Sequence, residues 1–145
     1  MIVLDESTRQ TVKAGVDVAI HYPERSVGWG GFLEDGLLCK EILPGFTAIV
    51  VTAYKNRIAV LGPEIQDEQV VVLKAGAELK IKCPPLASVV FEHEGVIFGV
   101  EVGNGRTVLV PTGRIVARFN MPGMEAVVLE VDLVPGELQV LRFGE

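Results

Sequence analysis

An internal similarity constrains the fold of this chain more than any other feature of its sequence. The segment TVKAGVDVAIHYP at 11–23 aligns with VLKAGAELKIKCP at 72–84, with Lys, Ala, Gly, Ile and Pro at matching places. Further pairs of segments match in the same order, namely 32–42 with 91–102, 45–52 with 105–112, and 56–60 with 113–117. The matched segments are about 60 residues apart throughout, which is typical of a tandem duplication.

The boundaries of the duplication follow from these matches. We place the first repeat at about 8–66, the second at about 67–130, and a terminal strand at 131–145. The segment LVPGELQVL at 133–141 resembles LKAGAELKI at 73–81, as though a third copy begins there. A unit of roughly 60 residues buries little apolar surface by itself. We therefore expect a single domain, 1–145, in which the two repeats pack about a pseudo-two-fold axis.

The local pattern within each repeat is that of β-strands. VDVAIHY and AELKIKC alternate between apolar and polar residues, which predicts strands with one buried face. FTAIVVTA is a continuous apolar run and predicts a strand that is buried on both faces. Long segments lack a helical apolar stripe, whereas turn-forming residues are frequent, with 16 Gly and 8 Pro. The sequence predicts an all-β sandwich or barrel of roughly ten to twelve strands.

Composition limits the partners and the location. The chain has 145 residues, is 49% hydrophobic and carries a net charge of −6, so it is a globular domain and nucleic acid is not expected as its main partner. No apolar run reaches the roughly 18 residues that span a bilayer. MIVLDESTRQ lacks the features of a signal peptide. We expect a soluble, cytoplasmic protein with no membrane partner, or one incorporated into a particle or shell. The Asn and Gln content, seven in total, is typical of heat-adapted proteins.

The sequence contains none of the common catalytic or metal-binding motifs. No serine lies in a GxSxG segment, and no GxxxxGK[ST] loop is present. Cys39 and Cys83 lack zinc-site spacing and lie among apolar residues, so we expect buried thiols. We predict no catalytic residues, no metal and no cofactor, and a non-enzymatic role is favoured over an enzymatic one.

The stretch FEHEGVIFGVEV at 91–102 places Glu92, His93 and Glu94 next to one another. Metal binding there would need ligands from other strands, because neighbours on one strand point to opposite faces. Glu-Gly between two apolar segments is instead the pattern of a two-residue hairpin loop, with glycine at positive φ. We predict a hairpin turn at Gly95, and another at Gly36 in the first repeat.

One segment of the first repeat departs from its counterpart and is the candidate for an added binding function. HYPERSVGWGG at 21–31 has aromatic and charged residues where the second repeat reads KCPPLASVV. Trp29 either caps the core or anchors a partner, and the core cap is favoured. Two acidic residues at matching positions of the repeats complete the candidate surface for a ligand or partner. Its residues are His21, Tyr22, Arg25, Trp29, Glu41 and Glu101.

These observations favour a non-enzymatic β module that forms a homo-oligomer or serves as a structural or adaptor part of a larger complex, such as a shell, coat or scaffold. One alternative is a small-molecule-binding protein or enzyme with a pocket at the junction of the repeats. A second alternative is a nucleic-acid-associated domain that binds through Lys74, Lys80 and Lys82 on one strand face.

Overall fold

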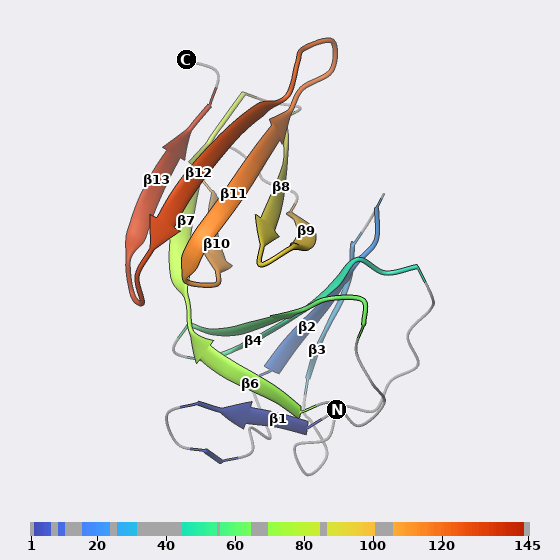
Figure 1. Cartoon of the computed structure of the whole chain (residues 1–145), viewed down its shortest axis with the longest axis vertical. Helices are drawn as coiled ribbons and strands as arrows, with labels where there is room; N and C mark the ends of the chain where they lie inside the picture. The colour runs from blue at the N-terminus through green and yellow to red at the C-terminus, as the bar shows by residue number, and fades with distance from the viewer. Residues whose placement is uncertain are drawn as a thin grey trace.

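The regular structure of this chain consists of β-strands. A computed structural model describes residues 2–6, 9–10, 16–23, 26–31, 45–54, 56–64, 70–84, 87–100 and 106–143, with the backbone alone for 2–5, 26–31, 99–100 and 106. These residues contain thirteen strands and no helix, so the all-β prediction is confirmed. Nowhere in the described ranges is there a helix long and apolar enough to cross a membrane. The strands form three sheets, none of which closes into a barrel (Figure 1).

The largest sheet occupies the lower half of Figure 1. In spatial order its strands are β1 (Ile2–Asp5), β6 (Val70–Ala75), β5 (Arg57–Leu61), β4 (Ala48–Ala53), β2 (Val16–His21) and β3 (Ser26–Gly31). All neighbours are antiparallel except β1 and β6, which run parallel. The alternation predicted for VDVAIHY is present in β2, where Val16, Val18 and Ile20 are buried.

The two smaller sheets form a sandwich in the upper half of Figure 1. One has the order β10 (Arg106–Val110), β7 (Ala77–Lys82) and β13 (Leu138–Arg142), and the other β12 (Val127–Leu133), β11 (Gly113–Asn120), β8 (Ser88–His93) and β9 (Val96–Val100). A single buried cluster joins the two sheets. It takes Leu79 and Ile81 from β7 and Phe91 and Phe119 from the four-stranded sheet. Phe119 stacks on Phe143, with ring centroids 4.8 Å apart.

The chain passes from the large sheet into the sandwich at Gly76, between β6 and β7 (Figure 1). A Cβ at this position would lie 2.8 Å from Ile58 Cγ2, 2.9 Å from Leu109 Cδ1 and 2.9 Å from the carbonyl oxygen of Val110. The Gly76 N–H donates to the Asn56 carbonyl at 2.8 Å, and the Gly76 carbonyl accepts from the Gly136 N–H at 3.0 Å. Only glycine fits here without displacing its neighbours.

Strand β4 lies between two buried clusters. Ile49 and Val51 belong to the cluster of the large sheet, whereas Ala48 belongs to the sandwich cluster and Val50 packs against it. The prediction that FTAIVVTA is buried on both faces is therefore confirmed. Cys83 is also buried, as predicted, and forms no disulfide with another described residue. Cys39 lies outside the described residues.

Where both matched segments are described, they contain strands, but the pairing of these strands differs. β2 pairs antiparallel with β4, and the matching β7 pairs antiparallel with β10. β4 also pairs with β5, whereas the matching β10 and β11 lie in different sheets. Gly15 lies outside the described residues, so its match with Gly76 is untested. The pseudo-two-fold arrangement and the repeat boundaries stay predictions.

The sequence similarity between 133–141 and 73–81 coincides with a contact in the fold. β13 pairs in parallel with β7, with Leu138 opposite Glu78 and Leu141 opposite Ile81. These are the residues that the sequence alignment of 133–141 with 73–81 places together. Two parallel strands in this register share the same alternation of faces, because the side-chain period of a strand is two residues.

Candidate functional site

The tip of the β8–β9 hairpin contains the Glu-His-Glu stretch. His93 pairs with Val96, and the two residues between them, Glu94 and Gly95, have φ values of 50° and 80°. Positive φ at both central residues is the signature of a type I′ hairpin turn. The predicted turn at Gly95 is confirmed. Its counterpart at Gly36 lies outside the described residues.

The His93 side chain is held by main chain and by its neighbour. Its Nδ1 lies 3.3 Å from the carbonyl oxygen of Arg114, and its Nε2 lies 3.9 Å from Glu94 Oε1. The His93 side chain is 16% exposed, whereas that of Glu94 is 85% exposed. In the described part of the chain, no three His, Cys, Asp or Glu side chains lie close enough together to hold a metal ion.

Replacing Gly95 with alanine is expected to lower the free energy of unfolding by about 1 kcal/mol, because alanine is strained at a φ of 80°. Steric clash does not contribute, since a Cβ at Gly95 has nothing within 4 Å. Asparagine tolerates the left-handed region better, so Gly95→Asn serves as the control and should retain more stability. Urea denaturation of both variants measures the difference. Equal losses for alanine and asparagine would contradict this explanation.

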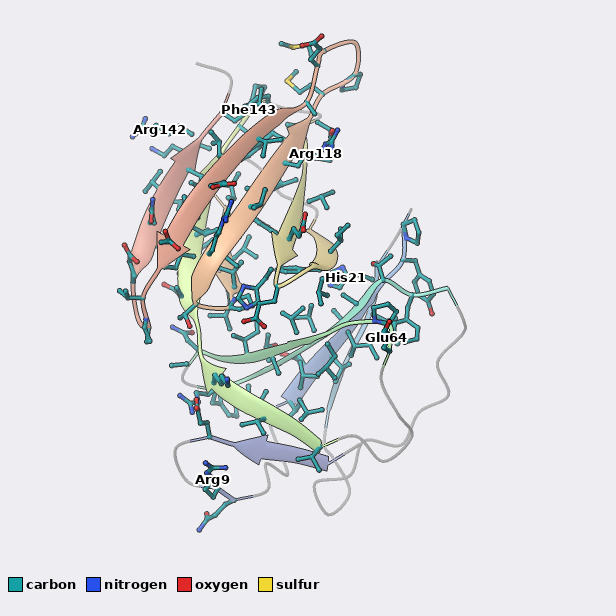
Figure 2. All side chains as sticks on the ribbon, in the orientation of Figure 1. Arg9, His21, Glu64, Arg118, Arg142 and Phe143 are labelled. Atoms are coloured by element: carbon teal, nitrogen blue, oxygen red, sulfur yellow. The ribbon has the colours of Figure 1, made fainter. Side chains whose placement is uncertain are left out.

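The structure describes two complete side chains of the six-residue candidate surface. His21 is 7% exposed, and its ring packs against Phe98 of β9, with centroids 6.3 Å apart and an angle of 64° between the rings. In Figure 2 it lies between the large sheet and the sandwich. Tyr22 is partly buried against the cluster of the large sheet. Both side chains thus contribute to packing between elements.

The side chains of the other four candidates lie outside the described part of the structure. The backbone of Trp29 pairs with Val18, and its side chain is outside the described part of the structure. Arg25, Glu41 and Glu101 also lie outside it. The choice between a core cap and a partner anchor for Trp29 stays a prediction.

A hollow of about 510 Å³ opens at one end of the sandwich, away from His21 and Tyr22. The turn at Met121–Met124, between β11 and β12, borders this hollow. In this turn the Met124 N–H donates to the Met121 carbonyl at 3.2 Å, and Gly123 has a φ of 77°. Phe143 lines it from the end of the chain, and Arg142 lies beside it at the outer edge of β13 (Figure 2). Its lining residues are Pro84, Met121, Met124, Val127, Leu129, Arg142 and Phe143.

The basic residues of the nucleic-acid alternative do not share one strand. Lys74 lies on β6 in the large sheet, whereas Lys80 and Lys82 lie on β7, beyond the corner at Gly76. Glu78 alternates on the same face of β7 as Lys80 and Lys82. The prediction of one strand face with three lysines is wrong, because the chain changes sheets between them.

An ion pair lies on the outer face of the four-stranded sheet. Arg114 of β11 donates a hydrogen bond to Glu130 of β12, and the two form an ion pair. The pKa of Arg114 is raised above its ordinary value, first by this hydrogen bond and then by the negative charge of Glu130. Both side chains are more than half exposed, so the pair contributes little to stability.

Exposed apolar side chains gather in one stretch of the chain. Among the described residues nine large hydrophobic side chains are exposed, and six of them lie between 124 and 140. They occupy β12, β13 and the turns that precede these strands. We call this set the β12–β13 apolar surface, and its residues are Met124, Val127, Val128, Val134, Leu138 and Val140.

The turn between β12 and β13 fixes part of this surface. Gly136 has a φ of 77°, the Glu137 N–H donates to the Val134 carbonyl at 3.1 Å, and Glu137 Oε2 accepts from the Val134 N–H at 3.0 Å. Pro135 and Gly136 thus form a tight turn between the two strands. Leu138 and Val140, exposed by 57% and 42%, follow it on an edge strand. Neither residue is among the predicted site residues, although apolar residues at 138, 140, 141 and 143 indicate a strand that is apolar on both faces.

No protein-family model, no curated protein and no solved structure matches the chain.

Proposed function

We propose that this chain is a non-enzymatic β module that associates with further copies of itself and so serves as a structural component of a larger assembly. The observation that carries the proposal is the β12–β13 apolar surface. Neighbouring exposed apolar side chains are typical of protein interfaces, and Leu138 and Val140 lie together on the outer face of β13. Four of the six side chains lie on β12 and β13, which are both sheet edges, and Met124 and Val134 lie in the turns before these strands.

Edge strands strengthen this argument. An edge exposes unpaired N–H and C=O groups, and proteins that stay monomeric protect such edges with charges, proline or bulges. On β13 the outward residues Leu138 and Val140 are apolar, Arg142 is charged, and the strand contains no proline. An edge that is mainly apolar supports association by strand pairing.

Charge predicts how this association depends on salt. Each copy has a net charge of −6, so copies repel one another electrostatically, and salt screens this repulsion. Burial of apolar surface is not weakened by screening. We therefore expect association to strengthen between low and physiological salt, the opposite of the dependence expected for nucleic-acid binding.

Replacing Val140 with lysine is expected to weaken self-association at least about 30-fold, since a buried interface side chain contributes about 2 kcal/mol or more. Sedimentation equilibrium across micromolar concentrations measures this change. Val70→Lys is the matched control, because Val70 is a valine of similar exposure, 47% against 42%, on β6 of the large sheet. It should associate as the unsubstituted chain does. A chain that sediments as a monomer throughout this range, at physiological salt, would exclude the proposal.

A further inference from the structure

Strand β13 is bonded along one side. It pairs with β7 from Leu138 opposite Glu78 to Arg142 opposite Lys82, and among the described residues no strand pairs with its other side. In that part of the chain, β13 is therefore an edge strand of the three-stranded sheet.

Two hydrogen bonds between β13 and β7 show which backbone groups of β13 face outward. The Glu78 N–H donates to the Glu137 carbonyl at 2.8 Å, and the Phe143 N–H donates to the Lys82 carbonyl at 2.8 Å. In a parallel ladder, alternate residues of one strand direct both their N–H and their C=O groups to the neighbour. Residues 137, 139, 141 and 143 therefore face β7, and the backbone groups of Leu138, Val140 and Arg142 face outward.

This arrangement fits a second copy of the same strand. In antiparallel pairing, two residues that both face the partner exchange two hydrogen bonds. A two-fold axis at Val140 places Val140 opposite the same residue of the second copy, and Leu138 opposite Arg142. Val140 then exchanges two hydrogen bonds with the same residue of the second copy, so the centre of the edge is complementary to itself.

The side chains agree with this register. Leu138 and Val140 alternate on the outer face of the sheet with Arg142, which is also exposed. Val140 packs on Val140, and the aliphatic part of Arg142 covers Leu138 of the other copy. No like charges lie directly opposite each other. The other edge strand, β12, is less suitable, because full overlap of 127–133 with a second copy places Glu130 opposite Glu130.

We propose that two copies of this chain pair their β13 strands antiparallel about a two-fold axis at Val140, which joins two three-stranded sheets into one continuous sheet. This inference rests on the self-association proposed above and names its interface. An isologous contact of this kind closes after two copies, so it produces a dimer and not a filament.

Cysteine cross-linking tests the register in the intact chain. In a Cys39→Ser background, which retains the buried Cys83, Val140→Cys should form a covalent dimer under mild oxidation. The expected Cα separation of about 5.5 Å for such a pair lies within the range for disulfides. Leu138→Cys alone should not cross-link, since it faces residue 142, but a mixture of Leu138→Cys and Arg142→Cys should give a mixed dimer. Val70→Cys is the control for random collision.

The results of these experiments distinguish a failure of the β13 interface from a failure of self-association. Cross-linking by Val140→Cys and by the mixture, with little by Leu138→Cys alone or Val70→Cys, supports the register. A chain that dimerises by sedimentation but does not cross-link at Val140, or cross-links equally at Leu138, would overturn this interface and leave self-association standing. A chain that is monomeric throughout would overturn both.

Discussion

Gly76→Ala is expected to lower the free energy of unfolding by about 3 kcal/mol or more, at the upper end of what overpacking costs. The added methyl group would lie 2.8 Å from Ile58 Cγ2 and 2.9 Å from the carbonyl oxygen of Val110. Side chains at such a contact can rotate away, but a backbone carbonyl in a strand cannot move without disturbing its ladder. Gly76 itself is held on both sides, by Asn56 and by Gly136.

Gly95→Ala is the comparison that isolates the clash. Gly95 has a φ of 80° and open space around it, whereas Gly76 is crowded. Gly95→Ala introduces backbone strain, whereas Gly76→Ala introduces steric overlap. The loss in free energy of unfolding at Gly76 should therefore exceed that at Gly95 by about 2 kcal/mol. Urea denaturation followed by circular dichroism measures both. A Gly76→Ala variant as stable as Gly95→Ala would mean that the corner between β6 and β7 is packed more loosely than described.

The strands themselves could be predicted from the sequence, because their period is local. The alternation in β2 and β7, the two-sided burial of β4 and the turns at Gly95 and Gly136 each depend on a few consecutive residues. Pairing is different, since it depends on segments far apart in the chain. The parallel pairs β1–β6 and β7–β13 have no local signal, and neither does the change of sheet at Gly76.

The candidate site was harder to predict, for a related reason. His21 breaks the alternation of β2: it follows the buried Ile20 and yet is buried itself. Its face of the strand is covered by Phe98 of β9, a residue that the sequence gives no reason to place there. The aromatic and charged residues near His21 predict a binding surface, whereas in the fold the His21 ring is buried against Phe98.

The apolar surface presents the reverse case. In LQVLR, apolar residues occur on both faces of the strand, and only the fold decides which face is covered. Leu141 faces the sandwich core and is buried, while Leu138 and Val140 face outward. A sequence can therefore indicate that a strand has too many apolar residues for one core, but it does not say which of them are available to a partner.

Phe98→Ala is expected to lower the free energy of unfolding by about 3–5 kcal/mol, the range for removing a fully buried phenylalanine ring. Phe98 is 2% exposed, and its ring lies 5.6 Å from that of Phe91 within the sandwich and 6.3 Å from that of His21 on the large sheet. The substitution thus leaves a cavity and also removes a contact between the two parts of the fold. Its neighbour Ile97 is 48% exposed, so Ile97→Ala should cost no more than about 1 kcal/mol.

A double-mutant cycle separates these two effects. If Phe98 stabilises the fold partly through His21, then His21→Ala should cost less in the Phe98→Ala background, with a coupling of about 1 kcal/mol. Additive losses would mean that the cavity accounts for the whole effect and that the two rings are merely near each other. A Phe98→Ala loss no larger than that of Ile97→Ala would contradict the burial of the ring. The coupling matters for assembly, because β13 can present a defined edge to a second copy only while the sandwich that supports it stays folded.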